Sequence, residues 1–213
     1  MKAYIFDLDG VLVDSAKYHY LAWKALADKL GFVFTEKDNE RLKGVSRMKS
    51  LEILLEIGNI KMSEEEKEKA AEEKNNLYRD YISKMTPSEI LPGVENFLKE
   101  IKALGKKTAI GSASKNTPLI LEKTGLDKYF NAVADGTIIT KAKPDPEVFL
   151  KGAEMLNVDP KDCIVFEDAV SGVQAAHNAG MKAVGVGDKS VLTMADLVIK
   201  SFEGFSLKCL ETI

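Results

Sequence analysis

The stretch "AYIFDLDGVLVDS", residues 3–15, decides the fold that we expect for this chain. Its first four residues form an apolar run typical of a buried strand, but the run ends in Asp7, and Asp9 follows. Ligands of open parallel sheets bind beyond the carboxyl ends of the strands. Two carboxylates at this position therefore indicate a functional site, although Asp9 followed by Gly10 is also a common turn signal on its own.

Composition excludes several classes of protein. With 213 residues, 45% of them hydrophobic, the chain can bury one large core or a core with a smaller insert. Thirty basic and 33 acidic residues give a formal charge of -3 without a basic block, so neither nucleic acid nor a membrane is expected as a partner. No apolar stretch approaches the roughly 20 residues that span a bilayer, and the N-terminus lacks a signal-peptide pattern, so we expect a cytoplasmic protein.

The cysteines carry no predicted chemistry. Cys163 and Cys209 fall in a predicted strand and a predicted C-terminal helix, which favours reduced core thiols over a disulfide or a zinc site. The sequence also shows no unusual apolar stripe, so a monomer is expected.

The segment after the first strand is predicted to be helical. Its first helix has Asp14 or Ser15 as a candidate cap, apolar residues at three- and four-residue spacing, and Gly31 as the stop. No convincing strand precedes residue 90, and the Glu and Lys run over residues 64–74 is typical of a solvated helix face with charge pairs.

From Pro92 onward, short apolar strands alternate with helices. We predict strands over residues 108–110, 129–136, 163–168 and 182–187. Such alternation indicates right-handed crossovers and a parallel sheet covered on both faces. The sequence thus predicts an α/β protein with a Rossmann-like parallel sheet core, residues 1–14 and 88–213, and an inserted all-helical cap domain, residues 15–87. We call these the sheet core and the helical insert.

Polar residues collect where the predicted strands end. Besides Asp7 and Asp9, these positions supply Ser112, Ala113, Ser114, Lys115, Asn116, Lys143, Glu167 and Asp168. Crowded carboxylates favour a bound divalent cation, and oxygen ligands favour Mg²⁺ over zinc. The hydroxyl, backbone N–H and ammonium donors suit phosphoryl oxygens, so phosphoryl transfer is the reaction class that the pattern suggests.

Each residue also has a simpler explanation. Ser112 and Ser114 fit ordinary loop positions, Lys143 fits a surface lysine, and Glu167 and Asp168 fit helix caps. Taken together, these explanations require several unrelated coincidences at one edge of the sheet.

The motifs "FDLDGVLVDS", "GSASKN", "KAKPDP" and "VFEDAVSGVQAAHNAG" resemble, in order, those of the haloacid dehalogenase superfamily of phosphotransferases. The resemblance implies that Asp7 is the nucleophile forming an aspartyl phosphate and that Asp9 is the general acid and base. It implies that Ser112 and Lys143 hold the phosphoryl group. It also implies one Mg²⁺ per site, bound by Asp7, the Asp9 backbone carbonyl, Glu167 and Asp168. To act as an acid near neutral pH, Asp9 needs a pKa well above the usual value of roughly 3.9.

The helical insert, with "DSAKYHYLAWKALADKLG" and "LKGVSRMKSL", resembles the cap of the β-phosphoglucomutase family. That family converts β-D-glucose 1-phosphate into glucose 6-phosphate through β-glucose 1,6-bisphosphate, the activating intermediate, so a second phosphate must be held at the far end of the sugar. The resemblance assigns this role to Arg47, Ser114, Lys115 and Asn116, and the planar fork of arginine suits phosphate. The remaining substrate-binding residues that it implies are His19, Trp23, Leu42, Lys43, Gly44, Val45, Ser46, Lys74 and Ala113.

Without the resemblance, Arg47 fits a surface arginine, Trp23 a core aromatic residue, and Lys74 part of the charge run.

The alternative function is a phosphatase that hydrolyses small sugar phosphates on the same scaffold. A third possibility, a non-enzymatic phosphate-binding domain, predicts the loss of Asp7 or Asp9, and both are present. The sequence therefore favours a sugar phosphomutase.

Overall fold

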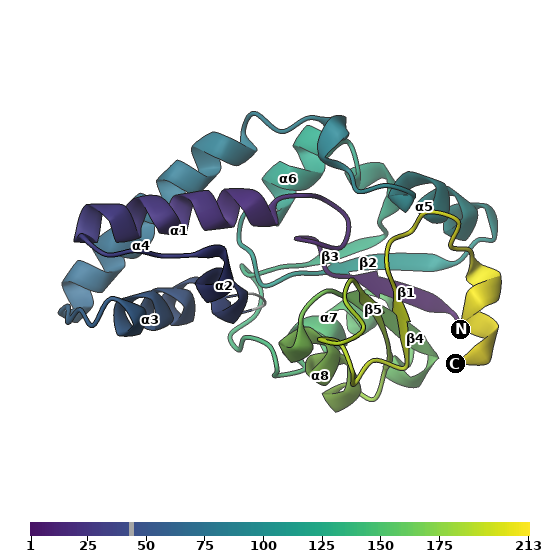
Figure 1. Cartoon of the computed structure of the whole chain (residues 1–213). Helices are drawn as coiled ribbons and strands as arrows, with labels where there is room; N and C mark the ends of the chain where they lie inside the picture. The colour runs from purple at the N-terminus through teal and green to yellow at the C-terminus, as the bar shows by residue number, and fades with distance from the viewer. Residues whose placement is uncertain (43–44) are drawn as a thin grey trace.

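The first strand of the sequence lies inside a parallel sheet that has six strands in the part of the chain that the computed structural model describes (Figure 1). That part is residues 1–42 and 45–213, without the side chains of residues 211 and 212. The spatial order is β3-β2-β1-β4-β5-β6. The strands are β1 (Ala3–Phe6), β2 (Lys107–Gly111), β3 (Ala132–Ala134), β4 (Cys163–Glu167), β5 (Lys182–Val186) and β6 (Leu197–Ile199). The predicted parallel sheet is thus confirmed.

Helices cover both faces of this sheet. On one side lie α5 (Val94–Ala103) and α6 (Thr117–Thr124), and on the other lie α7 (Glu147–Leu156) and α8 (Val170–Asn178) (Figure 1). Alternate residues of β1 serve the two sides, since Tyr4 and Phe6 join one apolar cluster and Ala3 and Ile5 join the other. Short 3-10 helices complete the sheet core at Pro87–Glu89, Asp127–Tyr129, Pro160–Asp162 and Leu207–Thr212.

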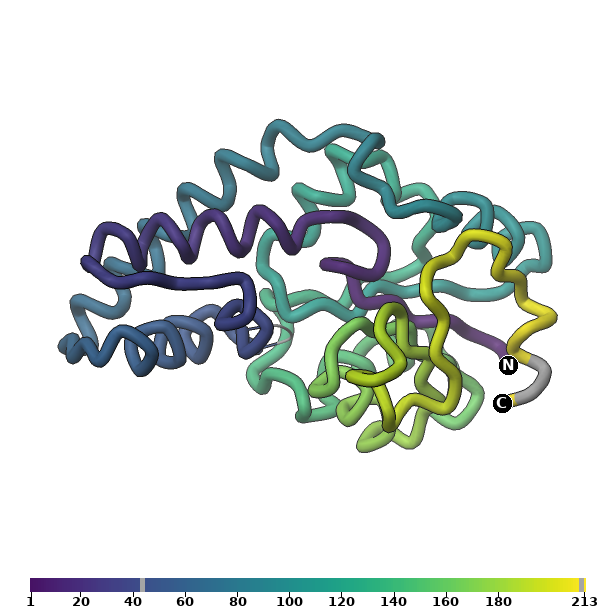
Figure 2. The backbone as a smooth tube through the Cα atoms, viewed as in Figure 1, coloured from purple at the N-terminus to yellow at the C-terminus, as the bar shows by residue number. Residues whose placement is uncertain are grey.

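The part of the chain that follows β1, as far as the end of α4, extends away from the sheet (Figure 2). It contains α1 (Ala16–Leu30), α2 (Glu36–Asn39), a 3-10 helix (Glu40–Leu42), α3 (Arg47–Ile57) and α4 (Glu64–Ile82). No strand precedes β2 after β1 among the described residues, as predicted. Trp23, Leu26, Phe34, Leu51 and Leu54 belong to an apolar cluster within this segment, so the insert has a core of its own.

The ends of the first helix show one confirmed prediction and one error. Gly31 ends α1 in the left-handed region with φ of 86°, as expected for a glycine stop. Ser15 occupies the N-cap position, but its side chain makes no capping hydrogen bond. Its hydroxyl instead donates to Asp9. The sequence pattern identified the position of the cap correctly and its role incorrectly.

The charged run on α4 is a solvated face with charge pairs, as predicted. Lys67 pairs with Glu64 at 2.6 Å, and Lys69 pairs with Glu65 at 2.7 Å. Such exposed pairs each contribute little to stability. Lys74, at the end of the same run, differs from these lysines because it is only 4% exposed.

Two further predictions need correction, and one strand was missed. The strand expected over residues 129–136 is confined to β3, because residues 127–129 form a 3-10 turn before it. The short strand β6 was not predicted, since its three half-buried residues give too weak a pattern. Cys163 is a core residue as expected, but Cys209 is exposed in a 3-10 helix and is not a core thiol.

Candidate active site

The register of the sheet brings three of the predicted site residues to one edge. Phe6 of β1 pairs with Ile110 of β2 and with Phe166 of β4. The residues that follow or end these strands, Asp7, Ser112 and Glu167, are therefore neighbours at the carboxyl edge. The backbone N–H of Asp7 donates to the Phe166 carbonyl at 2.9 Å, which holds Asp7 at this position.

Lys143 lies between two of these carboxylates. Its Nζ is 2.5 Å from Asp7 Oδ1 and 2.5 Å from Glu167 Oε1. The side chain is buried, so Lys143 is not the surface lysine of the simpler explanation. Burial alone would lower its pKa, but the charges of Asp7 and Glu167 outweigh this effect and hold the pKa above its usual value. Lys143 thus supplies a fixed positive charge beside Asp7.

The carboxyl groups of Glu167 and Asp168 occupy space that is free only because a glycine lies beside each of them. Glu167 Oε2 accepts a hydrogen bond from the Ala169 N–H at 2.8 Å, and burial raises the pKa of Glu167 although Lys143 opposes the change. A Cβ atom on Gly172 would collide with the Glu167 carboxyl group, and one on Gly10 would collide with that of Asp168. Gly10 also adopts φ of 82°, which favours glycine. The Asp-Gly turn therefore allows the acidic groups to gather.

Asp9 has surroundings suited to an acid and base. Its Oδ1 atom accepts hydrogen bonds from the Ser15 hydroxyl and from the Tyr78 hydroxyl, the latter at 3.3 Å. Burial, and then the charge of Asp7, raise the pKa of Asp9 to about 6, against the opposing effect of these hydrogen bonds and of Lys143. A carboxyl group with this pKa can both give and take a proton near neutral pH.

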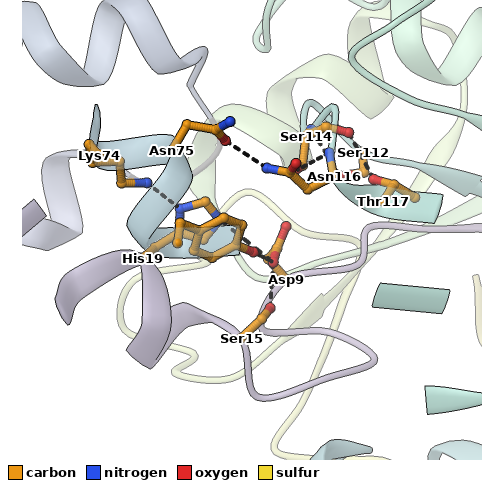
Figure 3. Close-up of polar contacts among 10 residues, drawn as sticks. Asp9, Ser15, His19, Lys74, Asn75, Ser112, Ser114, Asn116 and Thr117 are labelled. Atoms are coloured by element: carbon orange, nitrogen blue, oxygen red, sulfur yellow. Dashed lines mark hydrogen bonds and ion pairs between the residues drawn. The ribbon is translucent and has the colours of Figure 1, made fainter. Parts of the chain in front are cut away.

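Two residues of the helical insert extend this network (Figure 3). Lys74 Nζ is 3.0 Å from His19 Nδ1, and His19 Nε2 is 3.8 Å from Asp9 Oδ1. Burial, and then the charges of Lys74 and Arg47, lower the pKa of His19 well below its usual value, so the ring is neutral. Where Lys74 is the donor in this contact, the proton of a neutral ring is on Nε2, on the side of Asp9.

Lys74 itself lies between aromatic rings. Its Nζ is 4.3 Å from the Trp23 ring centroid and 4.8 Å from that of Tyr78. Burial, and then the charge of Arg47, lower its pKa to about 7. Trp23 belongs to the core of the insert and also lines the cavity. It therefore fits the prediction of a core aromatic residue, and its position is also compatible with contact to a substrate.

The loop after β2 presents hydroxyls and an amide (Figure 3). Ser112 Oγ accepts from the Ser114 N–H at 3.1 Å, and Ser114 Oγ accepts from the Asn116 N–H at 3.2 Å. Since each serine accepts from the backbone, each retains its hydroxyl proton for donation to an oxygen. This is the chemistry expected of residues that hold phosphate.

One cavity of about 630 Å³ joins the sheet edge to the helical insert. Arg47, half-buried in its wall, has its pKa lowered by burial while Glu72 opposes the change. The predicted site residues that line the cavity are Asp7, Asp9, His19, Trp23, Leu42, Val45, Ser46, Arg47, Lys74, Ser112, Ala113, Ser114, Lys115, Asn116, Glu167 and Asp168. Lys143 lies behind this wall, and Lys43 and Gly44 lie outside the described residues.

Sequence reasoning missed Tyr78, Asn75 and the link from Ser15 to Asp9. Tyr78 is four residues after Lys74, so the two lie on the same face of α4. Helical spacing from Lys74 was the signal that could have identified Tyr78, whereas Asn75 is turned away from Lys74 by one helical position and had no such signal. For Ser15 no such signal exists, because an N-cap serine normally serves its own helix.

The donor set fits a hard divalent cation. Asp7, Glu167 and Asp168 bring carboxylate oxygens to one end of the cavity, and oxygen-only donors suit Mg²⁺. Across residues 1–42 and 45–213, no three acidic, histidine or cysteine side chains are gathered closely enough to ligate one ion as they stand. Lys143 is the cation that Asp7 and Glu167 share here, so the magnesium site stays a prediction.

Known proteins resemble this chain over most of its length. A family model described as haloacid dehalogenase-like hydrolase matches residues 1–180. The β-phosphoglucomutase of Bacillus subtilis is 44% identical over 213 residues, which cover 99% of this chain and 94% of the relative. A crystal structure of β-phosphoglucomutase from Clostridium difficile matches with a TM-score of 0.95 and 45% identity, covering 99% of this chain and 96% of that one.

A second activity occurs among the relatives. The phosphorylated carbohydrates phosphatase of Thermotoga maritima is 35% identical over 187 residues, covering 86% of this chain and 84% of the relative.

In the described part of this chain, no helix is both long and apolar enough to cross a membrane.

Proposed function

Because the chain belongs to the haloacid dehalogenase-like hydrolase family, we propose that it is a phosphomutase that interconverts β-D-glucose 1-phosphate and glucose 6-phosphate. One observation carries the proposal. The acidic pair Asp7 and Asp9 and the phosphate-binding candidates Arg47 and Asn116 line the same cavity. A mutase needs both groups, because one phosphate reacts while the other is held.

In the first half-reaction, an Asp7 oxygen attacks one phosphorus of β-glucose 1,6-bisphosphate, and the bond from that phosphorus to the sugar oxygen breaks, which leaves a glucose monophosphate and the aspartyl phosphate. Asp9 gives its proton to that leaving oxygen. In the second half-reaction, Asp9 takes the proton of a hydroxyl on a glucose monophosphate. The oxygen of that hydroxyl attacks the phosphorus of the aspartyl phosphate, and the bond from phosphorus to Asp7 breaks, which forms the bisphosphate and frees the Asp7 carboxylate. A pKa of about 6 allows Asp9 to perform both steps near neutral pH.

Lys143 and Ser112 hold the transferring phosphoryl group. Lys143 already contacts Asp7, so its positive charge lies beside the atom that takes the phosphoryl group. Asp7, the Asp9 backbone carbonyl, Glu167 and Asp168 would hold one Mg²⁺, which when bound neutralises charge on the phosphoryl oxygens.

The second phosphate is held by Arg47 together with Ser114, Lys115 and Asn116. Arg47 comes from the helical insert and the other three from the sheet core, so a substrate with two phosphate positions bridges the two parts. We assign residues 15–87 to a cap over a core of residues 1–14 and 88–213. A closed cap excludes water and protects the aspartyl phosphate until the sugar hydroxyl attacks. The monomeric state and the cytoplasmic location stay predictions.

The second candidate function is hydrolysis of small sugar phosphates, which the similarity to the Thermotoga maritima phosphatase favours. The two functions differ in whether water or sugar attacks the aspartyl phosphate. Purified protein with Mg²⁺, β-glucose 1-phosphate and a trace of β-glucose 1,6-bisphosphate should form glucose 6-phosphate, as followed by phosphorus NMR. Inorganic phosphate that accumulates faster than glucose 6-phosphate would refute the mutase.

A further inference from the structure

A hydrogen bond joins the helical insert directly to the phosphate-binding loop. Asn116 Nδ2, before α6 of the sheet core, donates to Asn75 Oδ1, on α4 of the insert, at 2.9 Å (Figure 3). Both residues line the cavity. Asn116 is 5% exposed, so its amide belongs to the interior of the site.

Asn116 does not do what its position predicts. It occupies the N-cap position of α6, where asparagine is among the preferred residues because its side-chain oxygen accepts from the first turn of the helix. No such capping bond is present. Pro118 lies in that first turn and has no backbone N–H to be capped. The side-chain hydrogen bond that Asn116 does make is to Asn75, through Nδ2.

The bond to Asn75 determines how Asn116 meets a ligand. An asparagine amide has two N–H donors and one oxygen acceptor. When Asn75 accepts one N–H, the plane of the Asn116 amide is held, and the second N–H is left for an acceptor in the cavity. A phosphate offers only acceptor oxygens at this position, so an amide held with its NH₂ group in the cavity binds it and a reversed amide does not.

We propose that Asn75 is a positioning residue for the second phosphate and that it completes the phosphate site only when the helical insert lies against the sheet core. The proposal rests on the proposed mutase function, which requires that second phosphate. Since Asn75 is uncharged, it supplies the acceptor without repelling a phosphate, which an aspartate at the same place would do.

The test is a double-mutant cycle of Asn75→Ala and Asn116→Ala, with β-glucose 1-phosphate as substrate. Each single change should raise KM about five- to tenfold, the usual effect of one lost buried hydrogen bond. The double variant should lose no more than Asn116→Ala alone, because the two residues act through one contact. Alanine also favours a helix, so α4 should remain folded, which far-UV circular dichroism and thermal unfolding check.

A matched control and a second measurement separate positioning from a structural role. Asn76→Ala changes the neighbouring, exposed residue of α4 outside the cavity wall, and should keep the wild-type KM. Hydrolysis of acetyl phosphate, which carries a single phosphate, should be unchanged in Asn75→Ala.

The proposal is overturned if Asn75→Ala keeps the wild-type KM, or if the two single losses multiply in the double variant. Equal losses on acetyl phosphate would also overturn it, because the reacting phosphate needs no contact with Asn75. The identity of the wild-type product decides the proposed function separately. The comparison of variants on the same substrate decides the role of Asn75 whichever product forms.

Discussion

The hydroxyl of Ser15 donates a hydrogen bond to Oδ1 of Asp9 instead of capping the helix that follows Ser15. The Tyr78 hydroxyl donates to the same oxygen at 3.3 Å, and His19 Nε2 lies 3.8 Å from it. Three groups of the helical insert thus converge on one carboxylate oxygen. Under the proposed mechanism, the proton that moves to and from the sugar is carried by the other oxygen, Oδ2.

Replacing Ser15 should change the pH dependence of turnover. The Ser15 hydrogen bond lowers the pKa of Asp9, so Ser15→Ala should raise that pKa above its value of about 6. Below its pKa Asp9 is protonated and cannot accept the sugar proton, so the acidic limb of the rate profile should move to higher pH. We expect turnover at pH 7 to fall about fivefold, the usual effect of one lost hydrogen bond. Ser15→Thr keeps the hydroxyl and should keep the profile, and an unmoved limb in Ser15→Ala would contradict this role.

Replacing Arg47 should separate mutase activity from simple phosphoryl transfer. Removal of a charged partner from a phosphate usually costs about 2 to 5 kcal/mol, so Arg47→Ala should reduce mutase kcat/KM by roughly thirtyfold or more. Hydrolysis of acetyl phosphate needs only the Asp7 end of the cavity and should be largely intact. Equal losses in both assays would show that Arg47 supports the insert and does not bind the second phosphate.

Replacing Lys143 should make stability depend on metal. Without its ammonium group, Asp7 and Glu167 lose the cation that both contact, and breaking such a buried pair destabilises a protein by about 3 to 5 kcal/mol. Lys143→Met should therefore lower the midpoint of thermal unfolding in EDTA and recover part of it on addition of Mg²⁺. The control Lys151→Met removes only a surface pair with Glu154. A Lys143→Met variant that is as stable as wild type in EDTA would refute this account.

A carboxylate far from the cavity should contribute stability that depends on pH. Burial alone would raise the pKa of Asp196, but hydrogen bonds from Lys182, the Ala183 N–H and His177 outweigh it and lower the pKa from 3.8 to about 2. A lowered carboxyl pKa stabilises the fold above the unfolded value, and the contribution is lost as pH falls through the folded value. Asp196→Asn should cost about 2 kcal/mol at pH 7 and about half of that at pH 3, as measured by urea unfolding. A cost that is the same at both pH values would contradict the assignment.

Much of the fold follows from local pattern. The apolar runs of β1, β2, β4 and β5 and their alternation with helices were sufficient to predict the parallel sheet. That sheet then requires Asp7, Ser112 and Glu167 to be neighbours, because parallel strands end at one edge. The half-buried strand β6 and the exposed Cys209 were missed, since short terminal segments have little periodicity.

Sequence pattern was thus enough to place two kinds of group at one edge of the sheet, namely the acidic side chains and the side chains that can donate hydrogen bonds to phosphate. It was also enough to identify the helical insert. The folded chain was needed to show that Lys143 is buried between Asp7 and Glu167, that Ser15 serves Asp9, and that Asn75 meets Asn116. Some of these contacts join residues that are far apart in sequence. In the case of Ser15, a hydrogen bond to Asp9 takes the place of the expected cap on the helix that follows. Their energies depend on desolvation and on side-chain direction, and neither periodicity nor spacing carries that information.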